Sequence, residues 1–248
     1  KGQPVSTFYS YRFIGLSPVD GGPLFDDYSE QVDLLKNLNK YETFTTVLKP
    51  TGKRDPSMSG SVYNNFIWKR FRANLTLAYS LGAKLRQSRI LAQRPADDEN
   101  RFIYSEFNAN RALLNRWKAP GDEKNTIIPA IIGTNQPGYY AYNRHWTQQG
   151  GYEGIIFAET AWDMYDYCDA RVVSGNYLKC SNVSVAYVLP EKWLKTVRIS
   201  RFEATLSATN LFTVCSKKLK GQTPTQSVFS QVQLSDRPTI SLGFNVSF

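Results

Sequence analysis

Aromatic and acidic side chains gather between Gln87 and Asn176, where they could bind a ligand. Aromatic faces stack on sugar rings or peptide planes, and carboxylates accept hydrogen bonds from hydroxyl or amide groups. The candidate contact residues are Trp117, Tyr139, Tyr140, Tyr142, Trp146, Trp162 and Tyr165, with Asp122, Asp163 and Asp166. Alternatively, the same side chains form a small core of this unusually long connection.

Paired carboxylates are the other chemical possibility. Asp163 with Asp166, or Asp97 with Asp98, could act as the acid and base of a glycosidase. No pattern places either pair in a pocket, and the single histidine, His145, disfavours a Ser-His-Asp network. We therefore expect no catalytic residues and no enzyme activity.

Metal and cofactor signals are weak. Asp20, Asp26 and Asp27 could supply calcium ligands, but they lack the EF-hand spacing. The three cysteines, Cys168, Cys180 and Cys215, fit no zinc pattern. The sequence therefore predicts neither a metal site nor a cofactor.

The chain is basic, with 30 Lys and Arg against 21 Asp and Glu and a formal charge of +9. Its basic residues are scattered and accompany no nucleic-acid motif, so we expect no nucleic-acid partner. Anionic lipid headgroups or a charged channel would suit the same excess. No apolar run approaches the roughly 20 residues of a membrane helix, which excludes a helical membrane protein.

The last ten residues, 239–248, alternate strictly between apolar and small or polar side chains. This alternation predicts a strand with one apolar and one polar face. The apolar positions are Ile240, Leu242, Phe244, Val246 and Phe248.

Other stretches repeat this alternation and are predicted strands. Arg72 and Asn74, and likewise Arg201 and Glu203, lie opposite clean apolar faces, which suits a barrel with lipid outside and water inside. The predicted strands are Val5–Phe13, Ser61–Trp68, Phe71–Leu81, Tyr177–Leu189, Arg198–Phe212 and Thr239–Phe248, with weaker helical signals at Glu30–Leu38 and Phe107–Trp117.

The connections alternate in length, as they do in outer-membrane barrels. The short ones are Lys69–Arg70 and Glu191–Val197, and the long ones are Gly15–Ser59, Gln87–Asn176 and Thr213–Pro238. The predicted class is all-β, an antiparallel transmembrane β-barrel portion with long extracellular loops. The main alternative is a soluble β-sandwich that binds carbohydrate, and a β-rich hydrolase ranks last.

Several segments resemble, in the same order, the C-terminal part of SusC/RagA-type TonB-dependent outer-membrane transporters. These segments are YSYRFIGL with GGPLF near the start, Asn115–Pro129, Asp169–Pro190, Ala208–Val214, Gly221–Gln226 and the final RPTISLGFNVSF. The resemblance implies a barrel of roughly 22 strands plugged by an N-terminal domain. Because this chain offers only about six strands, fewer than closure needs, residues 1–248 are interpreted as the C-terminal part of such a barrel, without the plug and the earlier strands.

The same resemblance implies a function and partners. The whole protein would import oligosaccharides, or as a close second oligopeptides, across the outer membrane together with a SusD-like lipoprotein. TonB would act through the missing N-terminal part, and the remaining barrel strands and outer-membrane lipid would surround this segment. The aromatic contact candidates would then meet the cargo or the lipoprotein.

Two further expectations depend on this resemblance. The terminal strand with Ile240, Leu242, Phe244, Val246 and Phe248 resembles the signal read by the barrel-assembly machinery, and would place Phe248 at the periplasmic rim. Cys168 and Cys180 depart from the family's usual residues and would both lie on the extracellular side. A disulfide between them is a hypothesis.

Overall fold

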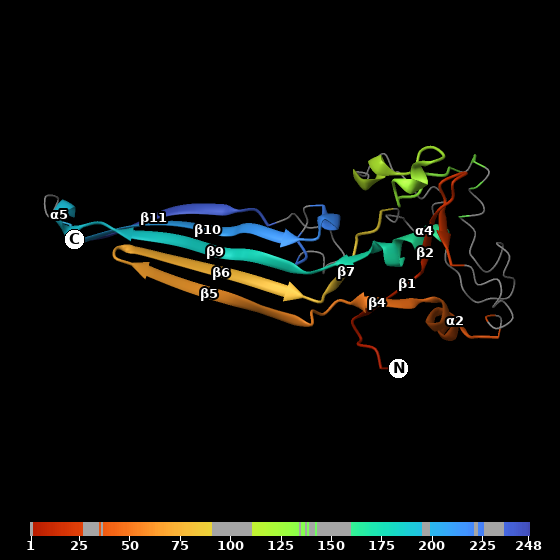
Figure 1. The fold of residues 1–248 in the computed structure, drawn as a ribbon, viewed down its shortest axis with the longest axis horizontal. Helices are drawn as coiled ribbons and strands as arrows, with labels where there is room; N and C mark the ends of the chain where they lie inside the picture. The colour runs from red at the N-terminus through yellow and green to blue at the C-terminus, as the bar shows by residue number, and fades with distance from the viewer. Residues whose placement is uncertain are drawn as a thin grey trace. The chain divides into compact units, whose positions relative to one another are not determined.

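The longest strands of the chain form one antiparallel sheet, visible in the ribbon of Figure 1. The structure is a computed structural model that describes residues 2–26, 35, 37–90, 111–133, 135–136, 138, 142, 160–194, 199–220, 223–225 and 236–248. The chain divides into two units. A loop unit comprises Lys1–Gly52 and Arg86–Val172, and a sheet unit comprises Lys53–Leu85 and Val173–Phe248.

The sheet unit holds five long strands in the order β11-β10-β9-β6-β5, and every neighbouring pair is antiparallel. Their bounds are β5 Met58–Trp68, β6 Phe71–Leu81, β9 Tyr177–Val188, β10 Arg201–Cys215 and β11 Thr239–Ser247. The five strands predicted between Ser61 and Phe248 are therefore present. The terminal strand β11 pairs with β10.

A two-residue turn joins β5 to β6. Trp68 pairs with Phe71, so Lys69 and Arg70 alone make the connection. Lys69 adopts the left-handed conformation, with φ 53°, which such tight hairpin turns require. The backbone N–H of Val188 donates to the Arg70 carbonyl over 3.0 Å, so the turn also contacts the end of β9.

A β-bulge interrupts the centre of the sheet. Pairing of β9 with β6 steps from Asn182 directly to Cys180, which leaves Ser181 as an extra residue. Opposite it, the pairing of β10 skips Asn210 and Leu211, and Asn210 has φ 53°. Asparagine tolerates this left-handed geometry better than most residues, so the bulge has a local cause in the sequence.

Short elements accompany the sheet. They are β7 Lys84–Arg86, which pairs with β8 Val172–Ser174, the helix α5 Glu191–Leu194, and a 3-10 helix over Lys217–Leu219. Leu85, Val173 and Leu219 form a small buried cluster. The connections before β9 and before β11 are long, and those after β5 and after β9 are shorter, as the sequence predicted.

The loop unit is built from short elements around one hydrophobic core. Strand β1 Thr7–Ser10 pairs with β4 Lys49–Lys53, and β2 Phe13–Leu16 pairs with β3 Pro23–Phe25. The helices are α2 Lys40–Val47 and α4 Ala161–Asp166, and 3-10 helices cover Arg111–Asn115, Asp122–Lys124 and Asp169–Arg171. Among the described residues of both units, no helix is long and apolar enough to cross a membrane.

Two predictions for the loop unit need correction, and the predicted helical stretches are only partly covered by the described residues. The predicted strand Val5–Phe13 is wrong as a strand of the large sheet, because the chain splits there into β1 and β2, which pair elsewhere. The predicted excursion Gly15–Ser59 contains β3, α2 and β4. Most of the helical stretch Glu30–Leu38, and the start of Phe107–Trp117, lie outside the described residues, and the latter ends in a 3-10 helix.

Candidate functional site

The five-stranded sheet brings its apolar side chains to one face. The cross-strand register places Phe71, Tyr187, Ala204 and Phe244 in one row, and Ala73, Val185, Leu206 and Leu242 in the next. Directly paired residues point to the same face of a sheet. Leu206 is 52% exposed and Leu242 is 65% exposed, so this face is not covered by a second layer.

The opposite face carries hydroxyl and amide groups. One row runs through Asn65, Asn74, Ser184, Ser207 and Ser241. The Tyr63 hydroxyl donates to Asn74 Oδ1 over 3.0 Å, and Asn74 Nδ2 donates to Ser184 Oγ over 3.3 Å. These two bonds link Tyr63, Asn74 and Ser184, and the hydroxyl and amide groups of this face suit contact with water. The edge strand β5 follows the pattern less strictly, since Asn64 lies on the apolar face and Ile67 on the polar face.

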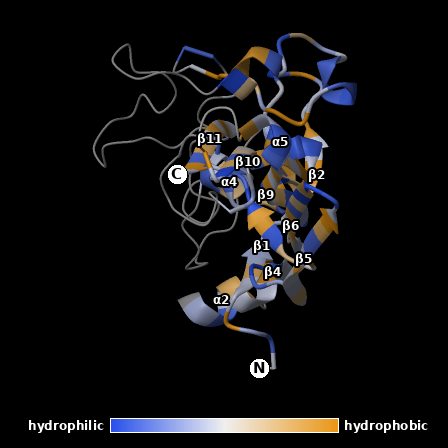
Figure 2. Ribbon diagram, turned by 90° about the vertical axis from the view of Figure 1, so that its left-hand side faces the viewer, coloured by the Kyte–Doolittle hydropathy of each residue, from blue (hydrophilic) through white to orange (hydrophobic). Residues whose placement is uncertain are grey.

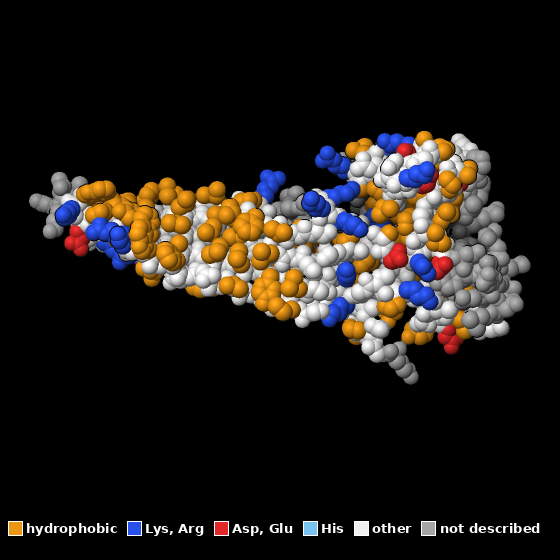
Figure 3. Space-filling view, in the orientation of Figure 1, with side chains coloured by type: hydrophobic (Ala, Val, Ile, Leu, Met, Phe, Trp, Pro, Cys, Tyr) orange, Lys and Arg blue, Asp and Glu red, His pale blue; other side chains and the backbone are white. Residues whose placement is uncertain are grey.

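The figures show how residues of each kind are distributed over the sheet. In Figure 2, which views the strands nearly end-on, orange hydrophobic and blue hydrophilic residues lie next to one another in the sheet. In Figure 3, hydrophobic side chains cover much of the visible face of the sheet unit. An exposed apolar area of this extent marks a surface that contacts lipid or another protein, because monomeric soluble proteins rarely expose so large an apolar area.

Strand β11 lies at one edge of this sheet. Its apolar residues are exposed, from Val246 at 37% to Phe248 at 91%, with Ile240, Leu242 and Phe244 between these values. In the described part of the chain, β11 pairs only with β10. A strand edge whose backbone groups have no partner is a site for adding another strand. The role of these five residues in barrel assembly stays a prediction.

Six of the seven aromatic contact candidates fall into two groups, and the seventh, Tyr142, is partly buried against the hydrophobic core. Tyr139, Tyr140 and Trp146 lie outside the described residues. Trp117, Trp162 and Tyr165 are buried in the hydrophobic core, with 8%, 2% and 0% exposure. These three do not offer a face to a ligand in this structure, and the alternative interpretation of a loop with its own core describes them better.

The core is held by contacts between distant parts of the sequence. Phe13 meets Tyr165 edge-on, with ring centroids 5.7 Å apart, and Tyr142 lies 5.9 Å from Trp162. Burial raises the pKa of Tyr165 to about 12, so its hydroxyl is neutral at physiological pH. The aromatic residues of the long connection thus stabilise the unit itself.

The acidic candidates also have structural partners. Asp122 Oδ2 accepts from the backbone N–H groups of Lys118 and Ala119, over 3.0 and 3.1 Å, and so closes a turn. At the start of α4, the Thr160 hydroxyl donates to Asp163 Oδ2 over 2.6 Å and accepts from the Asp163 N–H. This is the hydrogen-bond arrangement of a helix N-cap, so Asp163 has a structural role at the start of α4.

Asp166, proposed as a partner of Asp163, instead forms a buried ion pair. Its Oδ1 lies 3.7 Å from Arg171 Nε and accepts from the Ile90 N–H over 3.0 Å. Both side chains are almost fully buried, and a charge enclosed in this way requires its counter-charge. Asp97 and Asp98, the other proposed pair, lie outside the described residues.

The structure contains Cys168, Cys180 and Cys215 as free thiols, and the disulfide between Cys168 and Cys180 stays a hypothesis. Cys168 is enclosed in the core of the loop unit and Cys180 lies in β9 of the sheet unit, so each is buried by different neighbours. Burial also raises the pKa of Cys168 to about 11, which keeps it a thiol. Among the described residues, no group of three or more His, Cys, Asp or Glu is placed to hold a metal ion.

Sequence reasoning missed the role of Asp20, which organises the turn between β2 and β3. Asp20 Oδ1 accepts from the Gly22 N–H over 3.1 Å and from the Tyr142 hydroxyl over 2.9 Å. Burial opposes ionisation of Asp20, but hydrogen bonds from Ser17, Gly22 and Tyr142 outweigh it and lower its pKa. Burial and the bond to Asp20 raise the pKa of Tyr142 to about 12, so its hydroxyl remains a donor.

We expect this turn to loosen in acid. Because the pKa of Asp20 is lowered by folding, its stabilisation is complete above the ordinary carboxyl value of about 4 and is lost as the pH falls below it. Hydrogen exchange of residues 17–22 and 142, measured at pH 7 and pH 3, would test this. Asp20→Asn should loosen the same segment already at pH 7 and remove most of the pH difference; an unchanged difference would contradict this role.

Comparisons with known proteins agree with the fold. No protein-family model matches the chain, and no curated protein matches it in sequence. Solved structures of a RagAB peptide importer do match. The structure of its open-open state matches all of this chain with 17% sequence identity and a TM-score of 0.57. The structure of its closed-closed state also matches all of this chain, with 16% identity and a TM-score of 0.55. A structure of a RagAB peptide transporter matches 98% of this chain with 19% identity and a TM-score of 0.58.

These matches place the chain within a larger fold. The chain spans only 22 to 25% of the length of the matched chains. At such low identity the similarity establishes the fold alone. The chain is therefore a mostly β protein with the fold of one part of these importer chains, consistent with a fragment.

Proposed function

We propose that this chain forms part of the wall and the outer loops of a TonB-dependent importer in the bacterial outer membrane. The single observation that carries the proposal is the pair of unlike faces on the five-stranded sheet. Leu206 and Leu242 are exposed on a continuous apolar face, and the neighbouring Ser207 and Ser241 lie on a polar one. Barrel strands alternate in this way between lipid and lumen.

The dimensions of the sheet suit a bilayer. Along β6 the apolar face runs from Phe71 to Leu81, a rise of roughly 33 Å at about 3.3 Å per residue. At the usual tilt of barrel strands, about 40°, this length spans roughly 25 Å across the membrane, which matches the apolar band of outer-membrane barrels. The long connections 82–176 and 216–238 leave the sheet at one end, and the short ones leave it at the other.

The cargo and partners of the importer are part of the proposal. The neighbours are described as peptide importers, which makes oligopeptides the first cargo to test and oligosaccharides the second. By the family resemblance, a SusD-like lipoprotein would bind outside, and TonB would act through an N-terminal part of the importer. The proposal includes no catalytic step.

A soluble β-sandwich that binds carbohydrate is the competing function. A sandwich buries one face of each sheet against the other. Here Val185 on the central strand β9 and Phe71 on β6 are each 42% exposed. The exposed apolar face therefore favours the barrel.

Membrane fractionation of the full-length polypeptide tests the proposal. We expect it to sediment with outer membranes, to need detergent for solubility, and to co-purify with its lipoprotein partner and bound cargo identifiable by mass spectrometry. A protein that is monodisperse in buffer without detergent would reject the barrel interpretation.

A further inference from the structure

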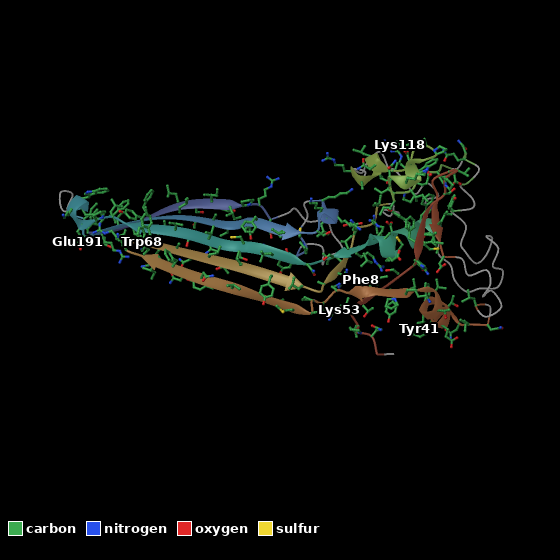
Figure 4. All side chains as sticks on the ribbon, in the orientation of Figure 1. Phe8, Tyr41, Lys53, Trp68, Lys118 and Glu191 are labelled. Carbon is green, nitrogen blue, oxygen red and sulfur yellow. The ribbon has the colours of Figure 1, made fainter. Side chains whose placement is uncertain are left out.

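The short-connection end of the sheet carries a group of exposed cations. Lys69 and Arg70 form the β5–β6 turn, and Lys192 lies in α5, which follows β9. The hydrogen bond from the Val188 N–H to the Arg70 carbonyl connects this turn to the end of β9. Figure 4 labels Trp68 and Glu191 at this same end, and Figure 3 shows Lys and Arg side chains gathered there. We call Lys69, Arg70 and Lys192 the basic rim.

Side-chain charge at this end is positive. Its described cations are Lys69, Arg70, Arg72, Lys192 and Arg201, and its described carboxylates are Glu191 and Glu203. Five cations against two carboxylates leave an excess of three positive charges. Glu203 is already engaged by Arg201 at 2.6 Å. In the described part of the chain, the basic rim has no such ion pair, so its charge remains available to an external anion.

Aromatic side chains lie beside the basic rim. Lys69 Nζ lies 4.9 Å from the centre of the Trp68 ring. The Trp68 ring stacks on Phe71 at 6.3 Å, and Phe71 lies 4.6 Å from Tyr187. Trp68 and Trp193 are 55% and 66% exposed. Tryptophan and tyrosine favour the boundary between hydrocarbon and water.

The order of these groups defines the ligand. Moving along β6 from the turn, cations come first, then the aromatic row, then the apolar residues Ala73 and Leu75. A free phosphate would use only the cations. An amphiphile with an anionic head and hydrocarbon chains would match the whole sequence of groups, with its phosphate at the cations and its chains along the apolar face.

We propose that the basic rim binds the headgroups of anionic glycerophospholipids, with Trp68 and Trp193 as neighbouring anchors at the membrane interface. The proposal rests on the barrel function above and adds a lipid preference at one rim. Binding would hold the short-connection end at the surface of one leaflet and fix the depth of the sheet in the membrane.

Native mass spectrometry of the full-length polypeptide tests the preference. The protein is equilibrated with equal amounts of phosphatidylglycerol and phosphatidylcholine, and the ratio of retained lipids is measured. The triple variant Lys69→Gln, Arg70→Gln, Lys192→Gln should lower the ratio of retained phosphatidylglycerol to phosphatidylcholine at least about tenfold. Each cation near an anionic membrane surface raises binding roughly fivefold. The matched control is Lys84→Gln, Lys217→Gln, Lys220→Gln, which removes three cations outside this rim and should leave the ratio unchanged.

Three outcomes would overturn the proposal: an unchanged ratio in the rim variant, an equal loss in both variants, or a rim-dependent preference for lipid A phosphates alone. If the rim variant does not fold, a salt titration of the wild-type protein still decides, because a headgroup bound by cations must be released as ionic strength rises. Failure of the barrel function is distinguishable, since the wild-type protein would then not enter lipid at all.

Discussion

Replacing Leu206 by arginine is expected to cost about 2–4 kcal/mol of membrane-folded stability, the penalty for arginine at the bilayer midplane on the lipid face of a barrel. Leu206 lies in the middle of β10, between Val185 and Leu242 on the apolar face. The matched control, Ser207→Arg, changes the adjacent residue, which points to the polar face between Ser184 and Ser241. It should cost much less, because that face suits water.

This pair of variants separates a membrane protein from a soluble one. Leu206 is 52% exposed, and in water an arginine at so exposed a position would change stability by less than about 0.5 kcal/mol. The measurement is the denaturant dependence of refolding into lipid vesicles, followed by heat-modifiable migration on gels. Equal and small effects of Leu206→Arg and Ser207→Arg would exclude lipid as the partner of this face.

The sheet was largely predictable from the sequence because one of its faces is apolar and the other is polar. Along Phe71–Leu81 every second side chain is apolar, and the structure gives β6 these same bounds. Period-2 alternation is a local signal that requires no knowledge of distant contacts. The alternation fails at the bulge in β9, where Ser181 is an extra residue. Before the bulge the even-numbered Leu178 lies on the apolar face, and after it the odd-numbered Val183 and Val185 do.

The loop unit was less predictable because residue type does not separate a buried aromatic from an exposed one. The burial of Tyr165 depends on Phe13, and the position of Tyr142 depends on Asp20, both more than a hundred residues away in sequence. One local signal was overlooked. Asn39 and Glu42 form a capping box, in which each side chain accepts from the other residue's backbone N–H. This residue pattern predicts the start of a helix, here α2.

The same long-range packing makes Gly21→Ala the second change with a large expected effect. Gly21 has φ +71°, and a Cβ atom there would lie 2.3 Å from Cδ2 of Trp117. The matched control is Gly121→Ala, because Gly121 has φ +102° and open space around its Cβ position. Both variants carry the left-handed backbone penalty of about 1–2 kcal/mol. Only Gly21→Ala must also displace a buried indole, which adds about 1–3 kcal/mol of overpacking.

Hydrogen exchange and limited proteolysis of the loop unit would measure this difference, and the double variant Gly21→Ala, Trp117→Leu identifies its cause. Leucine lacks the ring atoms that a Cβ at position 21 would meet, so the second substitution should recover part of the loss and give a clear coupling energy in a double-mutant cycle. The Gly21 carbonyl also accepts from the Ala130 N–H over 3.0 Å, and the backbone N–H of Trp117 donates to the Ile128 carbonyl over 2.9 Å. A displaced indole should therefore expose residues 128–130 together with Trp117. Additive effects of the two substitutions, or equal losses in Gly21→Ala and Gly121→Ala, would contradict this. The left-handed backbone alone, and not contact with the Trp117 ring, would then cause the loss of stability in Gly21→Ala.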